Sequence, residues 1–80
     1  TYNRAIEVAK RVPKSEPGYV MAQQSINRWS LEILQLAKNR ASNKQYSSAI
    51  ATATLTPEDT AAYAEAQQLI KQWQKQVQDN

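Results

Sequence analysis

The sequence repeats itself at an offset of 44 residues, and this repeat restricts the possible folds more than any other feature. Residues 1–29 align with residues 45–73 without a gap, and 11 of the 29 positions are identical. A period of 20–50 residues is typical of solenoids and related arrays. We therefore expect one domain over residues 1–80 that holds two copies of one unit, residues 1–44 and 45–80. The identical pairs are Tyr2 and Tyr46, Ala5 and Ala49, Ile6 and Ile50, Ala9 and Ala53, Pro13 and Pro57, Tyr19 and Tyr63, Ala22 and Ala66, Gln23 and Gln67, Gln24 and Gln68, Ile26 and Ile70, and Trp29 and Trp73.

The spacing of apolar residues predicts a short helix followed by a long helix in each unit. Apolar side chains recur every three or four residues from Tyr2 to Val12 and again from Tyr19 to about Ala41, which is the spacing of one helix face. The segment between them holds two prolines and the only glycine, so the first helix must end there. The second unit follows the same plan, and the result is an all-α fold of four helices in the order short, long, short, long. The predicted core residues are Tyr2, Ala5, Ile6, Ala9, Tyr19, Ala22, Ile26, Trp29, Tyr46, Ala49, Ile50, Ala53, Tyr63, Ala66, Ile70 and Trp73.

Local residue types predict the helix ends and a second apolar face. Thr56 followed by Pro57 and two carboxylates, Glu58 and Asp59, is typical of a helix N-terminus, where threonine caps and acidic groups oppose the helix dipole. Asn43 is able to cap either the helix before it or the helix after it. A second set of apolar residues predicts that the first long helix packs between two neighbours. This set is Val20, Leu31 and Leu34.

The short helices resemble the second helix of a tetratricopeptide repeat, in which an aromatic residue precedes an Ala-Ile pair, a further small residue and a corner proline. Tyr46, Ala49, Ile50, Ala53 and Pro57 follow that pattern, with a period of 44 rather than 34 residues. The motif is also similar to Ala-Ile/Pro/Tyr/Ala-Gln/Trp repeats of cyanobacterial multi-repeat proteins. The resemblance implies a helical solenoid that binds other proteins and has no catalytic residues.

The composition argues against an enzyme. The chain contains no cysteine and no histidine, so it lacks the commonest zinc ligands, the commonest general base and a thiol nucleophile. Glu58 and Asp59 are the only adjacent carboxylates, and their place after Thr56-Pro57 indicates capping rather than acid–base chemistry. We expect no catalytic residue, no metal site and no cofactor.

The charge is unevenly distributed along the chain. Eight basic and three acidic side chains give residues 1–44 a net charge of +5, whereas two basic and four acidic ones give residues 45–80 a net charge of −2. Opposite charges favour head-to-tail attraction between copies or neighbouring repeats. An alternative is sequence-independent phosphate binding by two basic clusters at opposite ends of the first helix pair. The first cluster is Lys10, Arg11 and Lys14, and the second is Arg4, Lys38, Arg40 and Lys44.

The repeated glutamines and tryptophans are the remaining candidates for binding. Gln23, Gln24, Gln67 and Gln68 stand out among the glutamines because the repeat preserves them. Trp29 and Trp73 offer flat faces for a ligand. Their position on the apolar stripe, three residues after an isoleucine, favours packing between helices instead.

We therefore expect a non-enzymatic scaffold for protein interaction or assembly, with nucleic-acid binding as the alternative. Its partner would be another protein, neighbouring repeats or a second copy. No apolar run is long enough to span a membrane. The chain begins with Thr1 and holds fewer than the three or so repeats that solenoids need, so we expect it to be part of a longer protein. Nothing in the sequence assigns it to a compartment.

Overall fold

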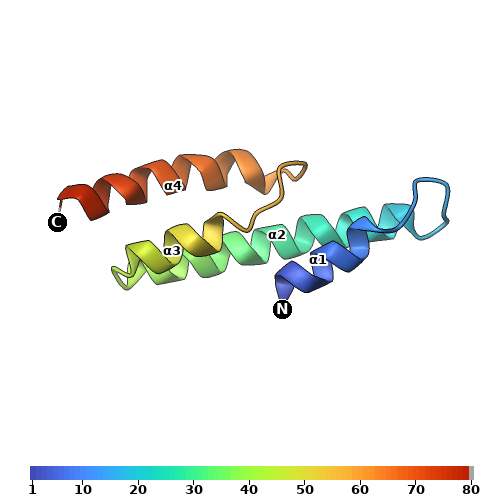
Figure 1. Ribbon diagram of the computed structural model, residues 1–80, viewed down its shortest axis with the longest axis horizontal. Coiled ribbons are helices and arrows are strands. Elements are labelled where there is room, and N and C mark those ends of the chain that lie inside the picture. The colour runs from blue at the N-terminus through green and yellow to red at the C-terminus, as the bar shows by residue number, and fades with distance from the viewer. Residues whose placement is uncertain (80) are drawn as a thin grey trace.

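The computed structural model describes residues 1–79, and these residues form four α-helices and no strand (Figure 1). The predicted all-α fold and the order short, long, short, long are confirmed. The described part of the chain is elongated, with extents of 49 × 20 × 14 Å. The helices are α1 (Tyr2–Lys10), α2 (Tyr19–Ser42), α3 (Tyr46–Ala53) and α4 (Ala62–Asp79).

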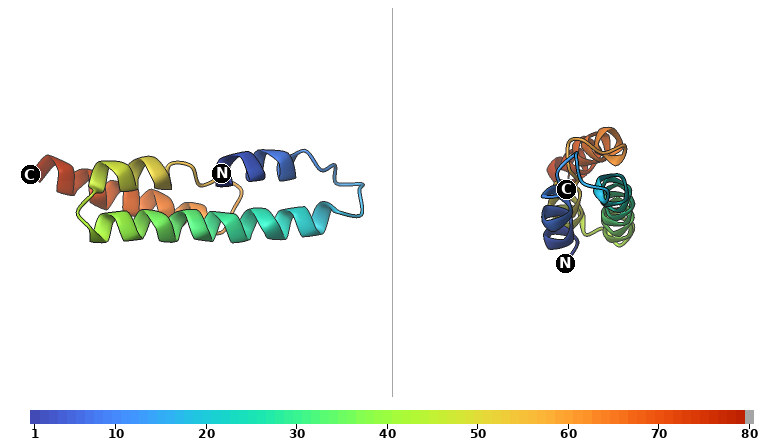
Figure 2. Two further views of the ribbon diagram at one scale, coloured as in Figure 1. Left: turned by 90° about the horizontal axis from the view of Figure 1, so that it is seen from below. Right: turned by 90° about the vertical axis from the view of Figure 1, so that its right-hand side faces the viewer.

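The two sequence repeats correspond to two similar helix pairs. α1 and α3 begin at equivalent positions, and α4 begins within one residue of the position equivalent to the start of α2. In both pairs the short helix runs antiparallel to the long helix, and α1 and α3 follow one another along the same side of α2 (Figure 2). α1 covers the N-terminal half of α2 and α3 covers its C-terminal half, while α4 packs on both α3 and α2. α3 therefore has a long helix on two sides, whereas α1 has one on a single side.

Three clusters of buried side chains hold this arrangement together. The first joins α1 to α2, the second joins α2, α3 and α4, and the third joins α2 directly to α4. Small residues dominate α3, so the helices on either side approach it closely. The clusters are Ile6, Ala9, Ile26 and Ile33; Ala37, Ala49, Ala53, Ile70 and Trp73; and Leu34, Ala62 and Ala66.

The predicted core residues are buried to different extents in the two units. Ala49, Ala53, Ala66, Ile70 and Trp73 are buried, as are Ile6, Ala9 and Ile26. The other predicted core residues are half-buried, except that Tyr2 is 39% exposed. The half-buried ones are Ala5, Tyr19, Ala22, Trp29, Tyr46, Ile50 and Tyr63.

The predicted start of the last helix is wrong. α4 begins at Ala62, six residues after Thr56, and residues 57–61 form a turn instead. The Thr60 amide and hydroxyl both donate to the Pro57 carbonyl oxygen, at 3.3 and 2.7 Å, which closes that turn. Thr56 Oγ1 is buried and accepts no backbone N–H from the described residues. Burial of Thr56 and Pro57 in the corner thus overrides the local capping pattern.

The second apolar face of α2 is only partly as predicted. Leu34 is buried against Ala62 and Ala66 of α4, but Val20 and Leu31 are exposed. α2 does pack between neighbours, and Leu34 provides the contact to α4.

The turn between α2 and α3 ends the helix by a pair of backbone hydrogen bonds. Asn43 is the C-cap of α2, and Lys44 adopts a left-handed conformation with φ of 61°. The Lys44 amide donates to the Ala41 carbonyl and the Gln45 amide donates to the Arg40 carbonyl, both at 2.9 Å. These two bonds form a Schellman motif, which normally places glycine where this chain has Lys44.

Candidate interaction groove

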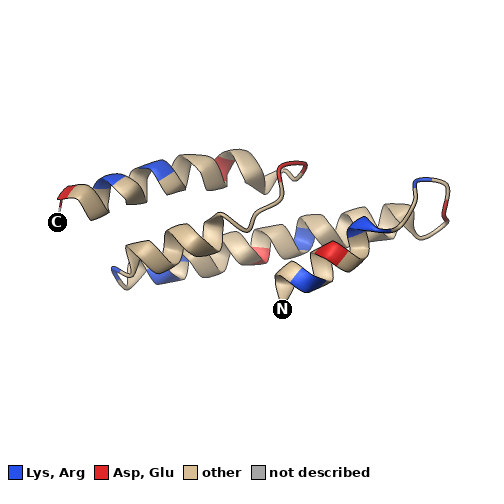
Figure 3. Ribbon diagram, in the orientation of Figure 1, with Lys and Arg blue, Asp and Glu red and all other residues tan. Residues whose placement is uncertain are grey.

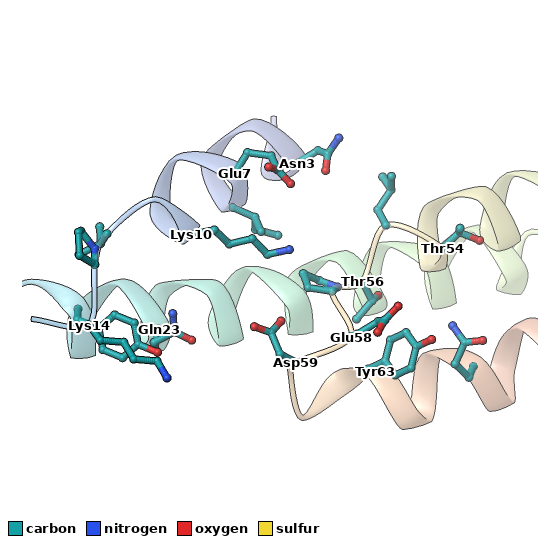
Figure 4. Close-up of a pocket in the computed structure, with 17 residues that line it drawn as sticks. Asn3, Glu7, Lys10, Lys14, Gln23, Thr54, Thr56, Glu58, Asp59 and Tyr63 are labelled. Carbon is teal, nitrogen blue, oxygen red and sulfur yellow. The ribbon is translucent and has the colours of Figure 1, made fainter.

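A groove of about 1040 Å³ lies between α1 and the start of α4, beside the N-terminal turns of α2 (Figure 4). The turn at residues 54–59 forms one side of the groove, and residues 12–14 close one end. No direct packing joins α1 to α4, because α1 ends beside the first half of α2 and α4 begins beside its middle. The groove follows from this offset between the two helix pairs.

Three pairs of identical residues at repeat-equivalent positions line the groove. Pro13 and Pro57, Tyr19 and Tyr63, and Gln23 and Gln67 all contribute to its surface. Within each unit the tyrosine and the glutamine are four residues apart, so they share one helix face. The groove thus presents the same two side-chain types from α2 and from α4, each half-buried and therefore held in place by its surroundings.

Both signs of charge border the groove. Lys10 projects from α1 toward the space between α1 and the 54–59 turn, and Glu58 and Asp59 extend from that turn (Figure 4). Glu7 and Lys14 also contribute to the lining. Within residues 1–79 no ion pair joins these groups to one another, since the salt bridge there connects Lys38 and Glu65 instead. The charged groups of the groove are therefore available to a ligand.

The predicted glutamine candidates separate into two kinds. Gln23 and Gln67 line the groove, whereas Gln24 and Gln68 are exposed and point elsewhere. Gln68 borders a separate shallow depression on α4. A glutamine amide both donates and accepts hydrogen bonds, so the groove pair has the chemistry to bind a peptide backbone.

The predicted basic clusters are only partly brought together. Lys10 and Lys14 both line the groove, while Arg11 is an exposed residue just after α1. Arg4 lies in the first turn of α1, whereas Lys38 and Arg40 lie in the last turns of α2 and Lys44 just after it. Figure 3 shows that the basic positions of α1 lie apart from those at the C-terminal end of α2. The second cluster of Arg4, Lys38, Arg40 and Lys44 is therefore a wrong prediction, because α1 is too short to reach that end of α2.

Two of those basic residues are engaged in contacts between helices. Lys38 Nζ lies 2.7 Å from Glu65 Oε2 of α4. Arg40 Nη1 donates a hydrogen bond to Thr52 Oγ1 of α3. Both contacts tie the C-terminal half of α2 to the second helix pair, so these side chains serve packing between the units.

The tryptophans pack between helices. Trp73 is buried among alanines and Ile70 at the junction of α3 and α4. Trp29 packs on the equivalent cluster of α1 and α2, and the Arg28 guanidinium lies 5.9 Å from the centre of its ring. Neither tryptophan lines the groove.

Tyr19 and Tyr63, two of the predicted core residues, line the groove, and the groove itself was not predicted from the sequence. Both tyrosines lie in the first turn of a long helix, after a corner that contains proline. That position indicates the end of a helix pair rather than its centre. Glu58 and Asp59, predicted to be capping residues, are exposed and line the groove.

The described residues contain neither a metal-binding cluster nor a membrane-spanning helix. Within residues 1–79 no three or more acidic, cysteine or histidine side chains come together as a metal site. None of the helices in that range combines the length and the apolar character needed to cross a membrane. No protein-family model, curated protein or solved structure matches this chain.

Proposed function

We propose that this chain is a non-enzymatic protein-interaction scaffold built from tetratricopeptide-like helical repeats, and that it binds an extended segment of a partner protein in the groove beside α1. The observation that carries the proposal is the lining of the groove by equivalent tyrosines and glutamines from both units. Two equivalent sets of side chains are suited to a ligand that offers the same chemical groups at regular intervals. An extended peptide backbone is such a ligand, because its amide groups recur along its length.

The side chains of the groove suggest how such a segment binds. Gln23 and Gln67 provide amides for the peptide backbone, and Tyr19 and Tyr63 provide flat apolar surfaces with a polar end. Lys10 favours an acidic side chain at one wall, and Glu58 and Asp59 favour a basic one at the other. A ligand with both charges matches the groove better than a purely acidic polymer such as a nucleic acid.

Peptide selection tests this function. A library of displayed peptides is selected against the 80-residue chain, and binding is measured for Gln67→Arg and for the matched control Gln68→Arg. Both substitutions add the same group to α4, but only the first enters the groove. We expect Gln67→Arg to weaken binding at least about tenfold, and Gln68→Arg to change it less than about twofold.

Mapping of the bound peptide provides the second readout. In a titration followed by NMR, the side-chain amides of Gln23 and Gln67 should shift, and those of Gln24 and Gln68 should not. Failure to select any peptide, or shifts confined to residues outside the groove, would contradict the proposed function. Binding of single-stranded or duplex DNA in place of peptide would favour the nucleic-acid alternative.

A further inference from the structure

The first helix pair exposes an apolar face at the positions where the second pair contacts α2. Thr52 of α3 is 5% exposed because α2 covers it, but the equivalent Val8 of α1 is 58% exposed. Glu65 of α4 pairs with Lys38 of α2, and the equivalent of Glu65 is Met21, which is 72% exposed. Val8 and Met21 therefore form an uncovered surface, which we call the open face. Its other members are Tyr2, Ala5 and Ala22, the equivalents of Tyr46, Ala49 and Ala66.

The structure itself shows what kind of element covers such a face. The C-terminal half of α2 lies on the second pair, with Ala37 against the alanines of α3 and Leu34 against Ala62 and Ala66 of α4. Ala41 also packs at that contact. α1 on α2 repeats the packing of α3 on α4, since Ile6, Ala9, Ile26 and Trp29 are equivalent to Ile50, Ala53, Ile70 and Trp73. A helix that resembles residues 34–41 thus fits the open face in the same orientation.

The chemistry of the open face differs from its internal counterpart at two positions. In the second pair, Thr52 accepts a hydrogen bond from Arg40, and Glu65 forms an ion pair with Lys38. Val8 and Met21 have no acceptor to offer to such cations. A lysine or arginine placed over them would lose solvation without gaining a partner. The helix that covers the open face therefore needs apolar residues at the positions equivalent to Lys38 and Arg40.

We infer that the open face of α1 and α2 binds an α-helix of the pattern Leu-x-x-Ala-apolar-x-apolar-Ala, the last turns of a further long helix of the same repeat type. The terminus of α4 does not supply this pattern, because Gln78 stands at the position equivalent to Leu34. The inference is independent of the groove, which shares no residue with the open face.

A tandem protein tests the inference. A second copy of residues 1–44 is joined directly ahead of Thr1 of the full chain, in register with the repeat. One version of the added copy keeps Lys38 and Arg40, and the other carries Lys38→Leu and Arg40→Leu. We expect slower amide hydrogen exchange in α1 of the original chain in the tandem than in the 80-residue protein, and the strongest protection in the leucine version.

Substitution of Val8 tests whether the open face is the surface that the added helix contacts. Val8→Lys in the original chain should raise the unfolding equilibrium constant at least about tenfold in the leucine tandem, because the contact would bury an unpaired charge. The same substitution should change it less than about twofold in the 80-residue protein, where Val8 is exposed. Val8→Lys in the added copy is the matched control, since that copy has no helix ahead of it.

Three outcomes would overturn the inference. The first is that amide hydrogen exchange in α1 is equally slow in the tandem and in the 80-residue protein, and that Val8→Lys changes the unfolding equilibrium constant equally in both. The second is greater protection by the version that keeps Lys38 and Arg40. The third is self-association of the 80-residue chain in sedimentation that Val8→Lys abolishes, which would assign the open face to a second copy. Peptide binding in the groove, measured with Gln67→Arg, reports separately on the proposed function.

Discussion

Arg40 of α2 donates a hydrogen bond from Nη1 to Oγ1 of Thr52 in α3, and the same hydroxyl donates to the Ser48 carbonyl oxygen at 2.8 Å. Thr52 thus links the long helix of the first unit to the short helix of the second. Thr52 is 5% exposed, so its hydroxyl is largely shielded from solvent. The equivalent Val8 shows that the short helix of this repeat type tolerates valine at this position on an exposed surface.

Thr52→Val should therefore lower the free energy of unfolding by about 1 kcal/mol, through loss of the hydrogen bond rather than of packing. Urea denaturation of Thr52→Val, Arg40→Met and the double variant measures the coupling between the two side chains. We expect the double variant to be less destabilised than the sum of the single ones, by about 1 kcal/mol. Strictly additive effects would mean that the hydrogen bond contributes nothing to stability.

The small size of Ala49 is required at the junction of three helices. Its side chain is 0% exposed and packs with Ala37 and Trp73. Ala49→Leu should destabilise the protein by about 1–3 kcal/mol, because the larger side chain overpacks this cluster. The measurement is thermal or urea unfolding followed by circular dichroism.

The matched control for Ala49 is its repeat equivalent, Ala5. Ala5 is half-buried on the open face, and α2 is the only helix of the described residues that packs on α1. Ala5→Leu should change stability by no more than about 0.5 kcal/mol. Equal destabilisation by the two substitutions would contradict the difference between a covered α3 and an uncovered α1.

The repeat predicted the helix pairs because identical residues at a fixed offset indicate the same local structure and the same packing of a short helix on a long one within each unit. α2 was placed within a residue or so at each end, since Pro17-Gly18 and Asn43 interrupt the apolar periodicity. The start of α4 was misplaced because Thr56 and Pro57 carry a local capping pattern but are buried by the tertiary fold. Such burial depends on residues distant in the sequence, and a local pattern contains no information about it.

The groove was not predictable from periodicity alone. A tyrosine on an apolar stripe has the same spacing whether it faces a neighbouring helix or a gap between two helix pairs. Tyr19 and Tyr63 face a gap because α1 stops short of α4, and this depends on how the units are offset in space. The open face was not predictable either, because α2 covers Thr52 whereas no helix of the described residues covers Val8.

We expect the buried hydroxyl of Thr56 to lower the stability of the protein. Thr56 is buried and its Oγ1 makes no hydrogen bond within the described residues. Thr56→Val replaces this hydroxyl by a methyl group of similar shape, and the first unit already has Val12 at the equivalent position. We expect an increase in the free energy of unfolding of about 1 kcal/mol.

Thr54→Val is the control for that substitution. Thr54 is exposed and its hydroxyl donates to the Ile50 carbonyl oxygen at 2.7 Å. Because water replaces that bond readily, Thr54→Val should change stability by less than about 0.5 kcal/mol. A loss of stability in Thr56→Val would indicate that its hydroxyl is satisfied by hydrogen bonds in solution.

Lys44 occupies a left-handed conformation that costs a side-chain-bearing residue about 1 kcal/mol relative to glycine. Glycine removes this cost, but it also gives the unfolded chain more conformational entropy, which lowers the gain. We therefore expect Lys44→Gly to raise the free energy of unfolding by at most about 0.5–1 kcal/mol. Asn43→Gly is the matched control: Asn43 has φ of −91°, so glycine there gains nothing and should lower stability. Urea denaturation of both variants gives the sign of each effect. A loss of stability in both would mean that the turn does not hold Lys44 in the left-handed conformation in solution.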